Sequence, residues 1–305
     1  MDRIDRSTTT TEFIFERPDG SRLPDWSPGA HIDVVLPSGK IRQYSLCGDR
    51  WMPHQYRIAV QREPNGTGGS AELHDELFPG DVISFGGPRN TFRLAPAQHY
   101  QFIAGGIGIT ALLPMIEQAV QLEAEWQLLY LGRSLERMAY RELAEQYPEH
   151  VTIHPSQPHG KTSIRDWLGE PPTDTMVYAC GPESLLDSLS SECSALPEHS
   201  VRTERFTNNL ADASVSSAPY EIELKRSGQV LQAPGTTPVV DVLNQAGVDV
   251  ITSCSKGVCG TCEIEVLAGA IDHRDAILDD EERAENACIF PCVSRALSQR
   301  LVLDL

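Results

Sequence analysis

Hydrophobic and polar positions follow different patterns in successive parts of the chain. In residues 1–95, short β-branched runs occur at Ile32–Leu36, Tyr56–Gln61 and Asp81–Phe85, with turns such as Pro79-Gly80 between them. Several short strands at this spacing are typical of a barrel or a sandwich. We therefore expect an all-β domain, built as an antiparallel β-barrel, at the start of the chain.

Strands and helices alternate over residues 100–206. The predicted strands are Tyr100–Ala104, Trp126–Gly132, His150–His154, Thr175–Ala179 and Val201–Phe206. The predicted helices run to about Glu125 after the first strand, over Arg141–Tyr147, and to about Ser194 after the fourth strand. This alternation predicts an α/β domain with a parallel sheet that is covered on both faces.

The last part of the chain has a third pattern. Asn208–Pro219 is polar and rich in small residues, so we expect a linker there. From Tyr220 the sequence alternates as a strand, and Arg300–Leu305 predicts a final strand. A length of 305 residues fits two or three domains. We predict domains at 1–97, 98–207 and 220–305, with the linker at 208–219.

Composition narrows the classes of function. The chain has 43 acidic and 25 basic residues and a formal net charge of −18. Such a surface repels DNA and anionic lipid, which argues against nucleic-acid and membrane partners. No apolar run reaches the ~18 residues of a membrane span. The first residues also lack the apolar core of a signal peptide, so we expect a cytoplasmic protein.

Five of the eight cysteines fall in the last 52 residues. Cys254, Cys259 and Cys262 have the spacing C-x4-C-x2-C, and 29 residues separate Cys262 from Cys292. This is the plant-type ferredoxin spacing for a 2Fe-2S cluster. A tight loop can supply three thiolates, and Gly257 would let its backbone turn closely around the cluster. We therefore predict these four cysteines as cluster ligands.

Two alternatives concern this cysteine set. A zinc site would prefer paired C-x2-C knuckles, whereas here the fourth cysteine is single and distant. Cys288 lies four residues before Cys292 and is the other candidate for the fourth ligand. Spacing favours Cys292, and Cys288 is then expected to be a buried free thiol.

A glycine-rich turn follows the first strand of the α/β domain. Gly106-x-Gly108-x-x-Ala111 has the G-x-G-x-x-G/A form, which brings backbone amides close to a pyrophosphate at a helix N-terminus. A plain strand-to-helix turn is the alternative. The acidic residue expected about 20 residues later is missing, because the second strand ends in Gly132-Arg133. Arg133 is our cofactor-binding candidate there. Glu136 and Arg137 are nearby alternatives, so the choice of coenzyme is left open.

Two motifs in the β-rich domain suit a flavin phosphate and ring. In Arg42-Gln43-Tyr44-Ser45, an arginine fork can hold a phosphate, a tyrosine can wall an isoalloxazine ring, and a serine can donate a hydrogen bond to it. Gly66-Thr67-Gly68-Gly69-Ser70 leads into a predicted helix and forms a second candidate phosphate site. Each motif alone is equally consistent with a surface strand or a glycine turn.

A further motif, Cys180-Gly181-Pro182, follows a predicted parallel strand. Ligands bind at the carboxyl edge of such sheets. Cys180 has no histidine nearby in the sequence, which argues against a nucleophilic role. A buried inert thiol is the alternative.

Taken in order, these motifs resemble the phthalate dioxygenase reductase family, which includes the vanillate O-demethylase reductases. The resemblance covers essentially the whole chain. The matching segments are Arg42–Ser45, Gly66–Ser70, Pro88–Phe92, Gly105–Thr110, Cys180–Pro182, the loosely matching Thr203–Phe206, and the four cysteines 254, 259, 262 and 292.

The resemblance implies electron transfer from NADH through FMN to a 2Fe-2S cluster and then to a Rieske-type oxygenase. The domain order, with a C-terminal β-grasp (α+β) ferredoxin domain, is the ground for FMN. The implied catalytic residues are Ser45 and Cys180. The implied cofactor-binding residues are Arg42, Tyr44, Ser45, Gly69, Ser70, Gly105, Gly106, Gly108, Thr110, Arg133, Cys180, Gly181 and the ring-stacking candidate Phe206.

Other functions stay as alternatives. A redox-sensing flavin and iron-sulfur binding protein would use the same motifs without a dedicated oxygenase partner. A flavohaem enzyme would need a haem domain, and a ferredoxin–NADPH reductase would have no fused ferredoxin. The acidic stretch Asp275–Glu285 is either a solvated segment or a docking face for a basic partner.

Overall fold

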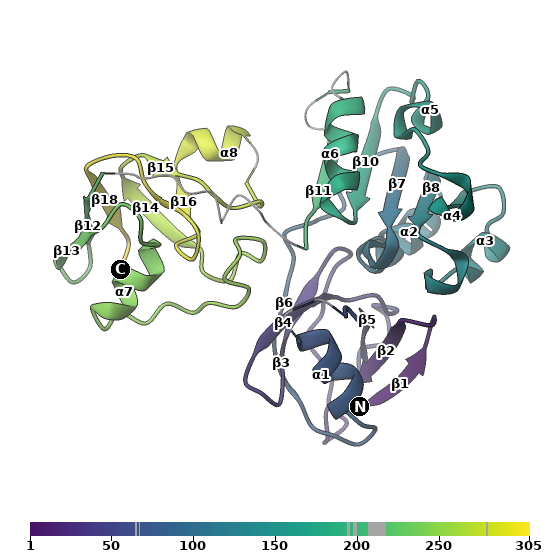
Figure 1. Cartoon of the computed structure of the whole chain (residues 1–305), viewed down its shortest axis with the longest axis horizontal. Coiled ribbons are helices and arrows are strands. Elements are labelled where there is room, and N and C mark those ends of the chain that lie inside the picture. The colour runs from purple at the N-terminus through teal and green to yellow at the C-terminus, as the bar shows by residue number, and fades with distance from the viewer. Residues whose placement is uncertain (65, 67, 194–195, 198–199, 207–217, 279) are drawn as a thin grey trace. The chain divides into compact units, whose positions relative to one another are not determined.

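In the computed structural model, the apolar runs of the first 95 residues form two three-stranded antiparallel sheets, with strand orders β1-β2-β5 and β4-β3-β6 (Figure 1). An isolated bridge between Leu46 and Ile58 joins them. Their inner faces share one apolar core that includes Phe13, Ile32 and Leu73. The elements are β1 (Asp2–Asp5), β2 (Thr10–Phe15), β3 (His31–Val35), β4 (Ile41–Ser45), β5 (Tyr56–Gln61), α1 (Gly69–Glu76) and β6 (Ser84–Arg89).

The structure describes residues 1–305 except 65, 67, 194–195, 198–199, 207–217 and 279. The predicted linker therefore lies outside the described residues, apart from positions 218 and 219. Contacts divide the chain into two compact units, Met1–Arg205 and Phe206–Leu305. The finer boundary at 97/98 stays a prediction.

One predicted strand of the β-rich part begins later than expected. Asp81 closes a turn in which its carboxylate accepts a hydrogen bond of 2.8 Å from the Phe78 amide, and Val82 is 82% exposed. The strand starts only at Ser84, where pairing with β3 begins. The prediction of a strand over Asp81–Phe85 was therefore wrong in its first three residues.

The segment after β6 closes the β-rich part. The Asn90 side-chain amide donates hydrogen bonds of 2.8 Å to Ser27 Oγ and to the Pro28 carbonyl. Arg89 forms an ion pair with Asp33 of β3. The Pro88–Phe92 motif thus has a structural role in this part of the chain.

A five-stranded parallel sheet follows, with strand order β11-β10-β7-β8-β9. The chain runs from β7 outward through β8 and β9 on one side, and β10 and β11 lie on the other side. The strand order therefore reverses at β7. The elements are β7 (His99–Gly105), η1 (Gly106–Gly108), α2 (Ile109–Gln121), β8 (Glu125–Gly132), η2 (Leu135–Arg137), α3 (Glu142–Gln146), β9 (Val151–Pro155), α4 (Ser156–His159), α5 (Ile164–Leu168), β10 (Thr175–Cys180), α6 (Glu183–Glu192) and β11 (Val201–Glu204).

Apolar side chains cover both faces of this sheet, as predicted. Leu112 and Met115 of α2 belong to the core on one face. Ile164 of α5 and Leu186 of α6 belong to the core on the other face. Helix α2 ends at Gln121, earlier than predicted, because Glu123 turns the backbone at φ 53° and Glu125 already begins β8.

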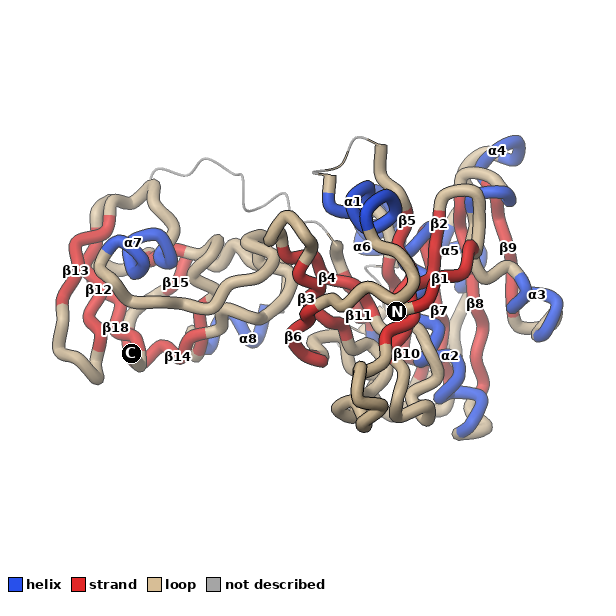
Figure 2. Tube along the Cα trace, turned by 90° about the horizontal axis from the view of Figure 1, so that it is seen from below, coloured by secondary structure: helices blue, strands red, loops and turns tan. Residues whose placement is uncertain are grey.

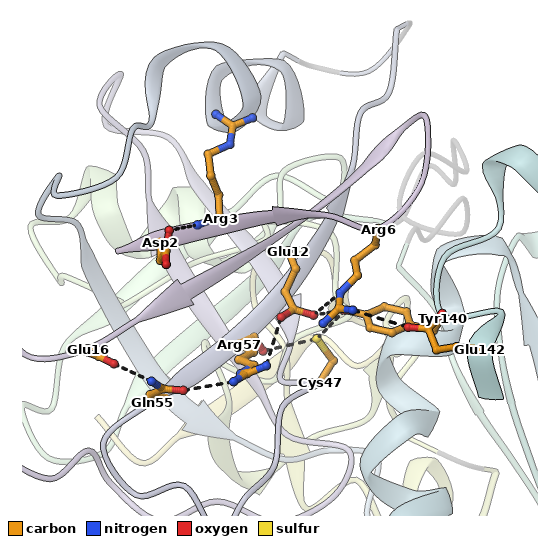
Figure 3. A network of polar contacts seen from close by, with 10 residues as sticks. All are labelled: Asp2, Arg3, Arg6, Glu12, Glu16, Cys47, Gln55, Arg57, Tyr140 and Glu142. Carbon is orange, nitrogen blue, oxygen red and sulfur yellow. Dashed lines mark hydrogen bonds and ion pairs between the residues drawn. The ribbon is translucent and has the colours of Figure 1, made fainter. Parts of the chain in front are cut away.

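A buried polar network joins the β-rich part to the parallel sheet (Figure 3). Glu12 of β2 is 2% exposed and forms ion pairs with Arg6 and Arg57 at 2.9 and 3.4 Å. The Tyr140 hydroxyl, which follows β8 in the chain, donates a 2.8 Å hydrogen bond to the same carboxylate. These contacts satisfy a carboxylate that would be costly to bury alone.

The second unit contains a mixed five-stranded sheet with strand order β13-β12-β18-β14-β16. Tyr220, Ile222 and Leu224 alternate along β12 and share the unit's core with Val239 and Leu243 of α7. Figure 2 labels both elements in this unit. The elements are β12 (Tyr220–Leu224), β13 (Val230–Ala233), α7 (Val239–Gln245), β14 (Ile264–Ala268), β15 (Ile271–Asp272), α8 (Asp280–Glu285), β16 (Cys288–Ile289), β17 (Arg295–Ala296) and β18 (Arg300–Leu303). Among the residues that the structure describes, every helix is too short or too polar to cross a lipid bilayer.

Candidate functional site

The loop between α7 and β14 carries Cys254, Cys259 and Cys262, and the segment after β16 adds Cys292. The Cys254 thiol is in hydrogen-bonding contact with the thiols of Cys259 and Cys292, and Cys292 is in contact with Cys262. Gly257 and Gly260 have φ values of 66° and 74°, as expected for a tight loop. A Cβ atom on Gly257 would lie 2.6 Å from a methyl group of Val293, so this glycine also permits close packing.

The surroundings of these sulfurs suit thiolates. The Lys256 amide donates to Cys254 Sγ at 3.3 Å, and the Thr261 amide donates to Cys259 Sγ at 3.4 Å. Hydrogen bonds from the Cys259 and Cys292 thiols, followed by backbone amides, hold the pKa of Cys254 well below its usual value. Amide donors of this kind stabilise the negative charge of a cluster's sulfur ligands.

The arrangement of the four cysteines fits a two-iron cluster. A 2Fe-2S cluster spreads its four thiolates over two irons, which the chain of contacts through Cys254 and Cys292 allows. A zinc ion would need all four around one centre.

Cys288 lies apart from this chain of contacts. It belongs to β16, pairs with Glu265 of β14, and packs beside the core of Phe290 and Val293. Burial raises the pKa of its thiol to about 11. These observations favour Cys292 as the fourth ligand, while ligation itself stays a prediction.

The first candidate phosphate site lies at the start of α1. Gly68 has a φ of 89°, and among the described residues no side chain caps the first amides of the helix. A Cβ atom on Gly69 would lie 2.6 Å from Arg42 Nε, so Arg42 of β4 runs directly past this turn. Lys40 Nζ also approaches Gly68. A cation beside uncapped helix amides fits a phosphate.

The other flavin-motif residues have different surroundings. Ser70 Oγ accepts a hydrogen bond of 3.0 Å from the Glu63 amide and so helps to hold the turn. Tyr44 is half-buried beside the β-rich core, and burial raises the pKa of its phenol, which therefore stays neutral. Thr67 of the predicted turn lies outside the described residues.

The second candidate phosphate site is the turn between β7 and α2. A Cβ atom on Gly105 would lie 2.6 Å from Pro182 Cδ, and one on Gly108 would collide with the Cys180 carbonyl. Glycines at these positions let the turn touch the Cys180-Gly181 backbone. This is the point where the strand order reverses, and ligands bind at such points in open α/β sheets.

The predicted cofactor-binding residues Thr110 and Phe206 have different surroundings. Thr110 is buried, and its hydroxyl donates to the Ile107 carbonyl at 3.0 Å, so it braces the turn. Phe206 follows β11 and is 41% exposed. Its predicted stacking role is neither supported nor opposed by its contacts.

Ser45 and Cys180 both lie next to Glu204, a residue that the sequence analysis did not single out. Glu204, the last residue of β11, hydrogen-bonds Ser45 and lies 4.0 Å from Cys180 Sγ. Burial raises the pKa of the Glu204 carboxyl to about 8, although part of the residue reaches solvent. The only signal in the sequence was the loosely matching segment Thr203–Phe206.

Cys180 is not a nucleophile in this setting. Its side chain is fully buried, and burial together with the Glu204 carboxylate raises the pKa of the thiol well above its usual value. The reactive form of cysteine is the thiolate. Cys180 therefore offers a neutral, packed wall beside Ser45 and Glu204.

A cavity of about 610 Å³ opens at the carboxyl ends of β7, β8 and β9. Gly105, Gly106, Arg133 and Pro182, all of which belong to motifs named above, are among its lining residues. Its size suits a nucleotide-sized ligand. Of the two alternatives that the sequence left open, Arg137 lines this cavity and Glu136 is not among its lining residues.

The predicted acidic docking stretch divides into two parts. Asp275 is fully buried and accepts hydrogen bonds from the Ile277 and Leu278 amides. The neighbouring Ala276 amide donates to the Gly257 carbonyl at 2.8 Å, which ties this segment to the cysteine loop. Asp275 is thus structural, whereas Glu281, Glu282 and Glu285 are exposed among the described residues of the stretch.

Comparison with known proteins matches both units. A model of the 2Fe-2S iron-sulfur cluster binding domain matches residues 222–297. A model of the dimethylamine monooxygenase subunit DmmA-like N-terminal domain matches residues 89–200. Vanillate O-demethylase oxidoreductase from Pseudomonas putida is 36% identical over 312 residues, covering 100% of this chain and 98% of the relative. Phthalate dioxygenase reductase from Burkholderia cepacia is 36% identical, covering 96% of this chain and 92% of the relative.

Solved structures agree. A phthalate dioxygenase reductase, described as a modular structure for electron transfer from pyridine nucleotides to 2Fe-2S, is 34% identical with a TM-score of 0.72 and covers 100% of this chain and 96% of its own. An intact type IV self-sufficient cytochrome P450 monooxygenase matches 99% of this chain with 34% identity and a TM-score of 0.93, and this chain spans 40% of that protein. The chain therefore belongs to the phthalate dioxygenase reductase family of flavin-dependent, 2Fe-2S-containing oxidoreductases.

Proposed function

We propose that this chain takes electrons from NADH and passes them, by way of FMN and a 2Fe-2S cluster, to a separate oxygenase. The observation that carries the proposal is the chain of thiol contacts among Cys254, Cys259, Cys262 and Cys292, next to amide donors. NADH gives up two electrons together, whereas a 2Fe-2S cluster accepts one at a time. A chain that joins this cluster to a unit with two candidate phosphate-binding turns therefore needs a carrier that can do both. FMN supplies that chemistry when bound.

Different residues of the first unit would bind FMN and NADH. Arg42, Gly69 and Ser70 would hold the FMN phosphate, because the arginine lies against uncapped amides of α1. Tyr44 and Ser45 would contact the ring. Gly105 and Gly106 would bind the NADH pyrophosphate at the turn that lines the cavity.

Glu204 and Cys180 would complete the reaction site. At neutral pH the raised pKa keeps a proton on the Glu204 carboxyl, although the hydrogen bond with Ser45 by itself lowers that pKa. We assign Glu204 to hold a proton at Ser45 Oγ, at the ring edge that Ser45 is proposed to contact. The neutral Cys180 thiol would position the nicotinamide by packing and exclude water.

The proposed partner is a Rieske-type oxygenase. Related chains are named as the reductase subunits of phthalate 4,5-dioxygenase and of a tert-butanol monooxygenase. Besides the four proposed cluster ligands, Cys47, Cys180, Cys193 and Cys288 are free thiols, which fits a reducing compartment and the cytoplasm as the place of work.

One observation favours a second candidate partner. The structural match at TM-score 0.93 is to 40% of a protein titled an intact type IV self-sufficient cytochrome P450 monooxygenase. A separate P450 is therefore the alternative electron acceptor. Reconstitution with either oxygenase, at equal concentration, would distinguish the two.

The test begins with purified, anaerobically handled protein. We expect a flavin and iron-sulfur visible spectrum, FMN on extraction, about two irons per chain, and steady NADH-dependent reduction of ferricyanide and cytochrome c. Colourless protein without iron would contradict the proposal. Bound cofactors without steady turnover would instead favour a redox-sensing binding protein.

A further inference from the structure

The nucleotide cavity of the first unit collects positive charge in a strongly acidic protein. Arg133, Arg137 and Lys161 all line it, although the chain carries a formal net charge of −18. Within the described residues, none of these three side chains has a carboxylate partner within 4.0 Å. Other arginines of the chain, such as Arg57, Arg62 and Arg300, do have one. Three unpaired cations in one cavity indicate an anionic ligand.

The three cations lie near the carboxyl ends of β8 and β9. Dinucleotide sites hold the adenosine ribose at this position of the sheet. Arg133 directly follows β8, and its carbonyl accepts a 2.9 Å hydrogen bond from the Gln157 amide of the loop after β9. That loop folds back so that the His154 ring nitrogen meets the Gly160 carbonyl at 2.9 Å, immediately before Lys161. The arrangement fixes both loops that carry the charges.

Arg137 is positioned from the other side. Its short helix η2 is pinned by Thr8 of the β-rich part, whose amide and hydroxyl donate to the Glu136 carbonyl at 3.1 and 3.0 Å. The Glu136 side chain stays outside the cavity, while Arg137 lines it. Among the described lining residues the only carboxylate is Glu63, which comes from the β-rich part and hydrogen-bonds Gln61.

The chemistry at these strand ends decides which coenzyme fits. In dinucleotide sites, an acidic residue after the second strand binds the free ribose 2′-hydroxyl of NADH, whereas an arginine there accommodates the 2′-phosphate of NADPH. Here the acid is absent and Arg133 takes its place, with Arg137 and Lys161 nearby. Ser156, at the end of the next strand, adds a neutral hydrogen-bonding group. A carboxylate would repel a phosphate, and these residues would attract it.

We infer that this cavity contains a 2′-phosphate subsite, formed by Arg137 and Lys161 together with Arg133, and that the enzyme accepts NADPH as well as NADH. The inference rests on the proposed function, which places the coenzyme in this cavity. It adds a binding site for the 2′-phosphate on the adenosine half of NADPH. The pyrophosphate is the other anion that such cations attract, so the test must separate the two.

The test compares the coenzymes in ferricyanide reduction by the holoenzyme. We expect kcat/KM for NADPH within about tenfold of that for NADH, and a fall of at least about tenfold in the NADPH/NADH ratio in the Arg137→Ala/Lys161→Ala double variant. Arg165→Ala is the matched control, because it removes an exposed cation from α5 outside the cavity. It should leave the ratio unchanged.

Ligand binding gives a readout that is independent of turnover. 2′,5′-ADP should bind the holoenzyme at least about tenfold more tightly than 5′-AMP, and the double variant should abolish this difference. A double variant that weakens both coenzymes equally would assign the cations to the pyrophosphate and overturn the inference, as would NADPH turnover below about one hundredth of that with NADH. Loss of activity with both coenzymes in the unmodified protein would instead contradict the proposed function.

Discussion

The Tyr140 hydroxyl donates a 2.8 Å hydrogen bond to Glu12 Oε2, and this contact links the parallel-sheet part of the first unit to its β-rich part (Figure 3). Burial, followed by the nearby Cys47 and Glu12, raises the pKa of the Tyr140 phenol, so that it remains a donor at all working pH values. Glu12 is also paired with Arg6 and Arg57, which makes the carboxylate a shared anchor for both parts.

Tyr140→Phe removes one donor from this buried carboxylate. Because hydrogen bonds to charged groups are worth about 1.5–3 kcal/mol, we expect a loss of that size in the free energy of unfolding. Denaturant unfolding of the first unit checks it. Tyr147→Phe is the control, since Tyr147 only accepts a hydrogen bond from the exposed Gln146 side chain, and its loss should cost less than about 0.5 kcal/mol. Equal stability of the two variants would show that the network does not join the parts.

Glu204→Gln tests the raised pKa of the Glu204 carboxyl. The unfolded chain ionises this group near its ordinary pKa, whereas the folded chain does so only near about 8. Between these two pKa values, the free energy of unfolding falls as the pH rises, by at most about 1.4 kcal/mol per pH unit for this one group. Glu204→Gln has no carboxyl group to ionise at this position, so its stability should not fall with pH in this way.

The measurement is the free energy of unfolding of both proteins between pH 5 and 8, which spans about three pH units. We expect Glu204→Gln to become progressively more stable than the unmodified protein toward pH 8. Parallel curves would mean that Glu204 ionises normally in the folded state. They would remove it from the proposed role of holding a proton beside Ser45.

Gly108→Ala places a methyl group against the Cys180 carbonyl. Both partners are backbone atoms of packed elements, so the β7–α2 turn must move away from Cys180. We expect KM for NADH to rise by at least about tenfold or stability to fall by more than about 2 kcal/mol. The flavin content per chain serves as the control, because Arg42 and Gly69 are on other elements. An enzyme with unaltered KM and stability would contradict the proposed approach of the two backbones.

Serine substitutions separate the cluster ligands from the remaining thiol. Cys254→Ser and Cys292→Ser should each lose the iron-sulfur absorption and about two irons per chain, because serine is a poor ligand for this cluster. Cys288→Ser is the matched control, since Cys288 lies in β16 outside the chain of thiol contacts. Loss of iron from Cys288→Ser with retention in Cys292→Ser would reverse the assignment of the fourth ligand.

The acidic stretch gives a prediction about ionic strength. If exposed acids such as Glu281 and Glu282 dock a basic partner, raising the salt concentration should slow electron delivery to the oxygenase. NADH–ferricyanide activity should stay the same, because it needs no protein partner. An equal fall in both rates would contradict docking through this stretch.

Local chemistry explains what could be predicted from the sequence. The spacing of Cys254, Cys259 and Cys262 reflects the reach of a single loop, and Gly257 has the positive φ that such a loop needs. The parallel sheet followed from apolar runs of strand length. The start of β6 was mispredicted because its register depends on β3, which is distant in the sequence.

Residues that act through distant partners could not be found this way. Glu204 gains its role from Ser45 and Cys180, which belong to other elements. Lys161 lies in a polar loop, and only the folded chain brings it to the cavity that Arg133 lines. Neither residue has a local pattern that distinguishes it from a solvated charge.

The central claim is that this chain converts electron pairs into single electrons. Its most direct test is an anaerobic titration with NADH, followed by visible and paramagnetic resonance spectroscopy. We predict the uptake of about three electrons per chain, two at the flavin and one at the cluster, and a Cys259→Ser variant that takes up about two and no longer reduces the oxygenase. An iron-sulfur centre that NADH leaves oxidised, or a Cys259→Ser variant that still supplies the oxygenase, would contradict the account.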